Sequence, residues 1–255
     1  IPNVYQLAKQ HNVPMIGNSH GNKSINRKTY EAFNICYDYA FCFGKFEYEQ
    51  YNKIYPGKML IGGIPTNDEL KYEEVQSSTD KHLLVIPNFT ANRYSIFKCN
   101  FDKQWAIQSV NIAKYYDIPI IIKQKTRTDS PDYNKHVDFI NSLYIDLDIK
   151  PIIINDTDNI NKLIADSAYV LSAISTLAFK SIQLNIPTIL IENSGDVGNF
   201  KKYPYVYNIN DDIVSKYKLI DPTTIKKFID NTIEGGCSFE SSNVYIKELI
   251  KVIKK

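Results

Sequence analysis

The sequence lacks the segments that identify membrane-spanning, secreted and nucleic-acid-binding proteins. No apolar run approaches the roughly 18–20 residues that a membrane-spanning helix needs, and no signal peptide is visible. The four cysteines form no CxxC pair, so they are typical of free cytoplasmic thiols and not of a disulfide framework or a zinc site. A net charge of +2 gives no electrostatic reason to expect nucleic acid as a partner.

The common motifs of nucleotide-dependent and hydrolytic enzymes are also absent. There is no GxxxxGK[ST] phosphate loop and no GxGxxG dinucleotide fingerprint. A GxSxG nucleophile elbow and a metal-ligand spacing are missing as well. The motifs that usually identify kinases, dehydrogenases and hydrolases are therefore missing, and we expect neither a metal nor a cofactor.

The sequence does contain a regular alternation of short apolar segments and amphipathic segments, which predicts an α/β protein. The polar stretch Tyr72–Lys81 has no periodicity and predicts a linker at 73–80. It separates an N-terminal α/β domain, 1–72, from a Rossmann-like domain, 81–255. Three strands are few for a domain of the first type, and the chain begins without a methionine. We therefore expect a partial or shortened N-terminal domain.

The expected elements follow from periodicity and from turn residues. Strands are expected at Val13–Gly17, Tyr39–Phe43, Lys58–Ile61, His82–Ile86, Ile118–Lys123, Ile152–Ile154, Ala168–Leu171, Thr188–Ile191 and near Tyr205–Tyr207. Helices are expected at Pro2–Gln10, Lys45–Asn52, Phe101–Tyr116, Pro131–Leu143, Ile160–Ala165, Leu177–Leu184, Pro222–Ile233 and Asn243–Val252.

The strand–turn–helix–strand unit Ile164–Glu192 carries the first candidate site. The apolar strand Ala168–Leu171 runs into a turn that contains Ser172, Ser175 and Thr176. In a parallel sheet this turn lies at the carboxyl edge, where hydroxyls and unpaired helix N–H groups favour an anion such as a donor diphosphate. The alternative is that Ser175 only caps the helix that follows.

A second candidate site is the polar loop after the first strand, which contains Asn18, Ser19, His20 and Gly21. A histidine with a pKa near neutrality can act as a general base toward a hydroxyl nucleophile. The alternative is an ordinary histidine in a surface loop.

Two further loops are candidate donor contacts. Gly62 and Gly63 carry no side chain, so their backbone can approach a ligand closely, although a plain turn explains them equally well. Lys123, Lys125 and Arg127 follow an apolar strand and could neutralise phosphate charge. A solvated basic loop is the alternative here.

The order of these loops resembles GT-B transferases, in particular the CDP-glycerol glycerophosphotransferase family of capsule and teichoic-acid enzymes. The resemblance spans about Val13 to Ile191. Four stretches carry it: Asn18–Asn22, Tyr37–Gly44, Ile61–Asp68 and Asp158–Thr176.

This resemblance implies a GT-B-like fold with an acceptor-side domain at 1–72 and a donor-binding domain at 81–255. It implies transfer of a glycosyl or polyol-phosphate group from a nucleotide-activated donor to a polysaccharide or polyol acceptor. The setting would be surface-polysaccharide or teichoic-acid-like polymer synthesis in the cytoplasm, with peripheral contact at the inner membrane face left open. His20 would be the catalytic base, and Ser175 and Thr176 would hold the donor diphosphate.

The sequence departs from the family at one position. The family carries a second histidine, followed by proline, after the strand that matches Ile118–Lys123, whereas this chain continues Gln124-Lys125-Thr126. We therefore expect as donor either CDP-glycerol, with reduced activity, or a different one such as a nucleotide sugar. Two alternatives stay open: an enzyme of the UDP-N-acetylglucosamine 2-epimerase type, and a non-catalytic nucleotide-sugar-binding module. Against the epimerase, no acidic cluster accompanies the Ser175 turn.

Overall fold

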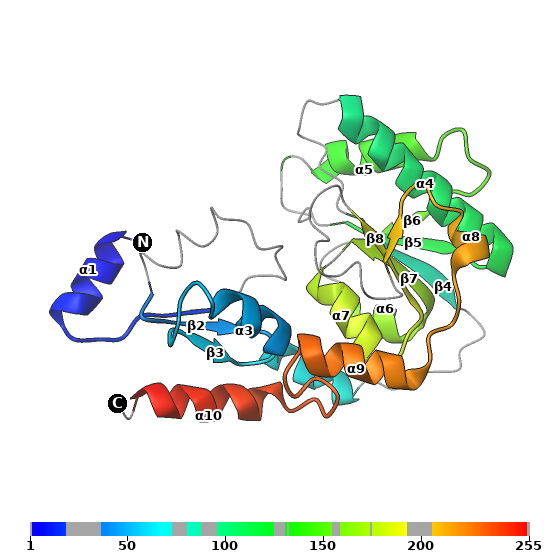
Figure 1. Ribbon diagram of the computed structural model, residues 1–255. Helices are drawn as coiled ribbons and strands as arrows, with labels where there is room; N and C mark the ends of the chain where they lie inside the picture. Colours follow the sequence, from blue (N-terminus) through cyan, green and yellow to red (C-terminus); the bar gives the residue numbers. More distant parts are fainter. Residues whose placement is uncertain are drawn as a thin grey trace. The chain divides into compact units, whose positions relative to one another are not determined.

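The structure, a computed structural model, describes residues 2–18, 37–72, 81–87, 96–124, 131, 133–154, 159–173, 175–192 and 206–253. The chain divides into two compact units. Unit 1 consists of residues 1–72 and 222–255, and unit 2 consists of residues 73–221. Each unit contains its own parallel sheet (Figure 1), so that the protein belongs to the α/β class that the sequence predicts.

Unit 2 alternates strands and helices from its first strand to its last. In chain order its elements are β4 (His82–Ile86), α4 (Ile96–Tyr116), β5 (Ile120–Lys123), α5 (Tyr133–Leu143), β6 (Ile152–Ile154), α6 (Ile160–Ala165), β7 (Ser167–Ala173), α7 (Thr176–Gln183), β8 (Thr188–Glu192), β9 (Val206–Asn208) and α8 (Ile213–Lys216). The main difference from the expected elements is α4, which begins five residues earlier, at Ile96, than the expected start at Phe101.

The strand order of unit 2 fixes where a ligand can bind. The six parallel strands lie in the order β6-β5-β4-β7-β8-β9. Successive connections run from β4 outward to β6 and from β7 outward to β9, so the direction reverses between β4 and β7. At such a reversal the loops on either side diverge and leave a crevice at the carboxyl ends of the strands. The carboxyl ends of β4 and β7 meet where Ile86 pairs with Ser172.

The sheet of unit 2 is covered on both faces. Figure 1 shows α4, α5 and α8 on one side and α6 and α7 on the other. All five residues of β4 are buried, as expected for the central strand of a parallel sheet. The core on the α4 side contains the fully buried Trp105 together with Leu83, Ile122 and Leu171. Burial of these side chains holds the carboxyl edge rigid.

Unit 1 contains a smaller parallel sheet in the order β1-β2-β3. Its elements are α1 (Pro2–Gln10), β1 (Ile16–Asn18), β2 (Tyr39–Cys42), α3 (Lys45–Tyr51), β3 (Met59–Ile61), the 3₁₀ helix η1 (Pro65–Tyr72), α9 (Pro222–Thr232) and α10 (Ser241–Ile253). These include the three strands expected before the linker.

The C-terminal helices correct the expected extent of the second domain. The sequence was expected to form one domain over 81–255, but residues 222–255 cluster with unit 1. The ring of Tyr245 in α10 stacks on Phe41 of β2, with centroids 4.1 Å apart. The Asp68 carboxylate accepts hydrogen bonds from the N–H groups of Ser241 and Ser242, at 2.9 and 2.7 Å, and so caps α10. The bonds from Asp68 join residues 173 and 174 positions apart, and no local pattern reveals such contacts.

Candidate functional site

The turn between β7 and α7 brings together three of the residues that the sequence singled out. Ser172 is fully buried in β7 and donates a hydrogen bond from Oγ to the carbonyl of Ala173, at 2.6 Å. Its Oγ also lies 3.3 Å from Oγ of Ser175. Either hydroxyl can be the donor in this second contact. The buried serine therefore orients the half-buried one.

Ser175 is also the N-cap of α7. Its backbone is extended, with φ −153° and ψ 164°, and its Oγ accepts a hydrogen bond from the N–H of Ala178, at 3.2 Å. The N–H groups of Thr176 and Leu177 are the first two of the helix, and the helix itself offers them no carbonyl. These groups and the half-buried Thr176 side chain lie at the positive end of the helix dipole. This arrangement suits an anion such as a phosphate.

A cationic side chain ends strand β5, which is separated from β7 by β4. Lys123 is only 7% exposed, and its Nζ donates to the carbonyl of Gln124, at 3.1 Å. This position at the carboxyl end of β5, beside β4, places the ammonium group on the same sheet edge as the Ser175 turn. Lys125 and Arg127, the other two expected phosphate contacts, lie outside the described residues.

Gln124 is a residue at this edge that the sequence did not single out. It is 3% exposed, and among the described residues its amide oxygen and amide nitrogen both lack a hydrogen-bond partner. A glutamine directly after an apolar, β-branched strand was the available sequence signal. From the sequence, Gln124 was named only in the stretch where the family's second histidine is missing.

The expected acceptor-side loop is largely outside the described residues, which include neither Ser19, His20 nor Gly21. The backbone of Asn18 ends β1, in register with Phe41 of β2. The general-base role of His20 therefore stays a prediction.

Gly62 and Gly63 follow β3 and pack against protein atoms. Gly63 has φ +65°, and a Cβ there would lie 2.3 Å from the carbonyl oxygen of Glu234 and 2.4 Å from Oγ of Ser241. A Cβ on Gly62 would lie 2.5 Å from the Phe41 ring. Close packing within unit 1 accounts for both glycines without a ligand, whereas their expected donor contact stays a prediction.

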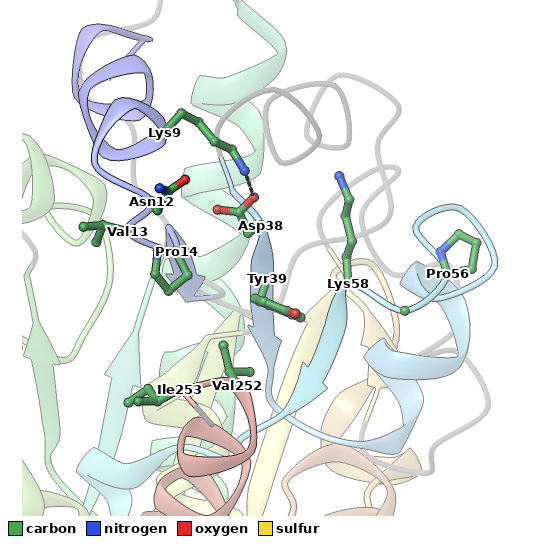
Figure 2. Close-up of a pocket in the computed structure, with 11 residues that line it drawn as sticks. Lys9, Asn12, Val13, Pro14, Asp38, Tyr39, Pro56, Lys58, Val252 and Ile253 are labelled. Carbon is green, nitrogen blue, oxygen red and sulfur yellow. Dashed lines mark hydrogen bonds and ion pairs between the residues drawn. The ribbon is translucent and has the colours of Figure 1, made fainter. Parts of the chain in front are cut away.

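Unit 1 also contains a cavity of about 770 Å³ at the amino ends of its strands. Figure 2 shows Lys9 reaching Asp38, with a distance of 2.5 Å between Nζ and Oδ1, while Lys58 lies across the opening. Burial raises the pKa of Asp38, but the hydrogen bonds from Lys9 and from the N–H of Met15, with the charges of both lysines, outweigh it and lower the pKa. None of the site residues predicted from the sequence lines this cavity, which lies at the opposite edge from the carboxyl ends of the strands.

Neither a metal-binding cluster nor a membrane-spanning helix is found in the described part of the chain. Within it, no three His, Cys, Asp or Glu side chains come together in a way that could hold a metal ion. None of the helices that the structure describes combines the length and the apolar character needed to cross a bilayer.

Comparison with known proteins gives similarity in structure alone. No protein-family model matches the sequence, and no curated protein matches it. Among solved structures, the wall teichoic acid polymerase TagF is 14% identical with a TM-score of 0.55, over 97% of this chain and 71% of that chain. Another TagF structure is of the H444N variant with CDPG, after a 30 minute soak.

Two further solved structures are similar over nearly the whole chain. The Neisseria meningitidis UDP-GlcNAc 2-epimerase bound to UDP-GlcNAc is 14% identical with a TM-score of 0.65, over 98% of this chain and 73% of that chain. S. aureus MnaA in complex with UDP is 15% identical with a TM-score of 0.62, over 98% of this chain and 71% of that chain. These similarities show a GT-B-like fold, as the sequence resemblance implied. At sequence identities this low, these similarities do not assign the chain to a family.

Proposed function

We propose that this chain is a transferase that moves a glycosyl or polyol-phosphate group from a nucleotide-activated donor to a hydroxyl acceptor. The acceptor would be a growing surface polysaccharide or a teichoic-acid-like polymer. One observation carries the proposal: the Ser172–Ser175 turn and the N-terminus of α7 lie where the strand order reverses between β4 and β7. Transfer in the cytoplasm, at the inner face of the membrane, is part of the proposal.

The proposed donor site is chemically suited to a diphosphate. The N–H groups of Thr176 and Leu177 would donate hydrogen bonds to its oxygens, and Ser175 would hold the helix end in place. Lys123, with Lys125 and Arg127, would supply positive charge as the leaving group develops negative charge. Ligands of the structural neighbours support this choice, since MnaA holds UDP and the Neisseria epimerase holds UDP-GlcNAc.

The proposed reaction needs one proton transfer. His20 removes the proton from the acceptor hydroxyl, and the resulting oxygen nucleophile attacks carbon or phosphorus of the donor. Attack on the anomeric carbon of a nucleotide sugar releases a nucleoside diphosphate. Attack on the glycerol-bearing phosphorus of CDP-glycerol releases CMP. The released nucleotide therefore identifies which bond breaks.

The test combines binding with product analysis. The full chain is heated with CDP-glycerol, CDP, UDP, GDP and several nucleotide sugars. A ligand present at a hundred times its dissociation constant should stabilise the chain by about 2.7 kcal/mol. The stabilising donor is then incubated with and without a polyol acceptor. Nucleotide release that requires the acceptor supports transfer, whereas no stabilisation by any donor contradicts the proposal.

The role of His20 is tested separately. We expect His20→Ala to lower turnover about 100-fold or more while leaving donor affinity nearly unchanged, as for loss of a general base. His11→Ala is the matched control, because His11 is exposed in the turn after α1. Equal loss of turnover and donor affinity, or no loss, would remove His20 from the mechanism.

A 2-epimerase activity is the second candidate, favoured by the TM-score of 0.65 to the Neisseria enzyme. Epimerisation needs no acceptor, so UDP-GlcNAc alone would be converted to its epimer. A non-catalytic module would bind the nucleotide and release no product under either condition.

A further inference from the structure

The buried side chain of Gln124 contributes no hydrogen bond to the stability of the described part of the chain. It is 3% exposed, and its amide has no hydrogen-bond partner among the described residues on either its oxygen or its nitrogen. Burying an amide without partners is unfavourable, because the hydrogen bonds to water are lost and not replaced. An unsatisfied buried group of this kind requires an explanation, and a functional role is one.

Gln108 shows how the same side chain is used for stability elsewhere in unit 2. It is 7% exposed, and its Nε2 donates to the carbonyls of Ile209 and Asp211, at 2.9 and 2.8 Å. These bonds tie α4 to the segment before α8. Gln108 is therefore a satisfied structural glutamine, and Gln124 is not.

The position of Gln124 in the fold indicates which ligand it could contact. Gln124 directly follows β5, and its N–H donates to the carbonyl of Ile154 at the end of β6. It lies at the carboxyl edge of the sheet, one strand from β4 and two from β7. Since neighbouring strands are about 4.8 Å apart, the Ser175 turn is roughly 10 Å away along that edge. A nucleotide-linked ligand spans such a distance from its diphosphate.

The hydrogen-bonding capacity of the amide indicates which chemical group of the ligand it can pair with. A phosphate group offers acceptors only, so it would satisfy the amide nitrogen and leave the oxygen without a partner. A hydroxyl of a sugar or polyol, or the edge of a nucleobase, both donates and accepts and would satisfy both atoms.

We propose that Gln124 is a ligand-binding residue of unit 2 whose amide pairs with a donating and accepting group of the nucleotide-linked ligand, away from its diphosphate. This inference rests on the proposed function. Because the amide is buried, its rotamer would change on binding.

The experiment compares Gln124→Met with Gln108→Met in the full chain. Both substitutions keep an unbranched side chain and remove the amide, but only Gln108 loses hydrogen bonds within the protein. Without ligand, we expect Gln124→Met to melt at or above the wild-type temperature and Gln108→Met to melt below it. Calorimetric titrations then use pyrophosphate, UDP, UDP-GlcNAc and CDP-glycerol as probes.

We expect Gln124→Met to weaken binding of a nucleotide probe by about tenfold, the effect of losing one or two hydrogen bonds, and to leave pyrophosphate binding unchanged. Equal weakening of UDP and UDP-GlcNAc would identify the nucleoside as the contact. Weakening of UDP-GlcNAc or CDP-glycerol alone would identify the transferred group.

Two results would overturn this inference without contradicting the proposed function. They are wild-type affinities in Gln124→Met, or a melting temperature of Gln124→Met lowered as far as that of Gln108→Met. Equal weakening of pyrophosphate would overturn it as well, because it would place the amide on the phosphates. If the wild-type chain binds none of the probes, both the proposed function and this inference are contradicted.

Discussion

Ser175, the N-cap of α7, and Ser181, within α7, use their hydroxyls differently. Ser175 caps the first turn and faces the positive helix end, whereas Ser181 is fully buried and bonds to Oγ1 of Thr188, at 2.8 Å. Only the first lies where a ligand phosphate is proposed. The pair therefore separates the effect of a lost hydroxyl on folding from its effect on binding.

We expect Ser175→Ala to lower the free energy of unfolding by about 1 kcal/mol, because the N-cap bond to Ala178 is lost. It should also weaken nucleoside diphosphate binding about tenfold or more, since the hydroxyl and the ordered helix end are both lost. Ser181→Ala should lower stability by a similar amount and leave the affinity unchanged. Urea denaturation and calorimetry measure the two quantities. Equal affinities in the two variants would limit Ser175 to its capping role.

His82 makes the stability of unit 2 depend on pH. It is buried at the amino end of β4, and its Nε2 lies 3.1 Å from Oγ of Ser167. Burial lowers the pKa of His82 and outweighs the opposing effects of the Asp166 charge and the Leu163 backbone. The folded state thus favours the neutral ring.

Because the unfolded chain binds this proton more readily, stability is complete above the unfolded pKa of about 6.5 and falls as the pH drops below it. We expect the melting temperature to decrease between about pH 6.5 and 5, where most carboxylates are still ionised. His82→Gln should flatten this decrease, and His11→Ala, at an exposed position, should not. A steep decrease that persists in His82→Gln would assign the effect to other groups.

At this scale the sequence predicts what depends on neighbouring positions in the chain. Ser175 is predicted correctly as an N-cap, because a serine before an apolar helical stretch is a local signal. Gln124 is not predicted, because its burial and its missing partners depend on segments that are distant in the sequence.

At the scale of elements, the loop after β3 is held by its packing on the C-terminal segment. Gly63 needs both a positive φ and the absence of a Cβ, whereas Gly57, with φ +76°, has nothing within 4 Å of a Cβ. We expect Gly63→Ala to lower the free energy of unfolding by about 3 kcal/mol or more, since backbone strain and steric overlap add. Gly57→Ala should cost about 1 kcal/mol through strain alone. Similar losses in urea denaturation would contradict the close packing at Gly63.

The capping of α10 by Asp68 gives a second expectation at this scale. Asp68→Ala removes the acceptor for the N–H groups of Ser241 and Ser242 and should cost about 2 kcal/mol. Hydrogen exchange should quicken at the start of α10. Asp68→Asn keeps one acceptor oxygen and should lose less. Unchanged exchange in Asp68→Ala would mean that α10 does not depend on this cap.

At the scale of the whole molecule, the two units differ in how the chain forms them. Unit 2 is one continuous segment with a complete six-stranded sheet and its own core. Unit 1 is built from both ends of the chain, since α9 and α10 cluster with the first 72 residues.

We expect a fragment of residues 73–221 to unfold cooperatively in urea, because it contains every residue of its main core. Residues 1–72 alone should not fold, since they lack the Tyr245 ring that covers Phe41. Joining 1–72 to 222–255 through a glycine-rich linker should restore folding. Cooperative unfolding of 1–72 by itself would contradict this division.

The α/β class is predictable from this sequence because strand and helix periodicity repeats along the chain, whereas the GT-B-like fold was implied by the resemblance of its loops to a known family. The return of residues 222–255 to unit 1 is not predictable in the same way. An amphipathic helix such as α10 shows that one face is buried, but it does not show which sheet buries it.

The central claim is that the carboxyl edge of unit 2, at the Ser175 turn, binds the diphosphate of a nucleotide donor. Hydrogen–deuterium exchange of the full chain, with and without saturating UDP or CDP, tests the location most directly. We expect slower exchange at the N–H groups of residues 175–178, where the proposed phosphate contacts lie. Protection confined to the cavity near Asp38 in unit 1, or no protection at either place, would contradict the claim.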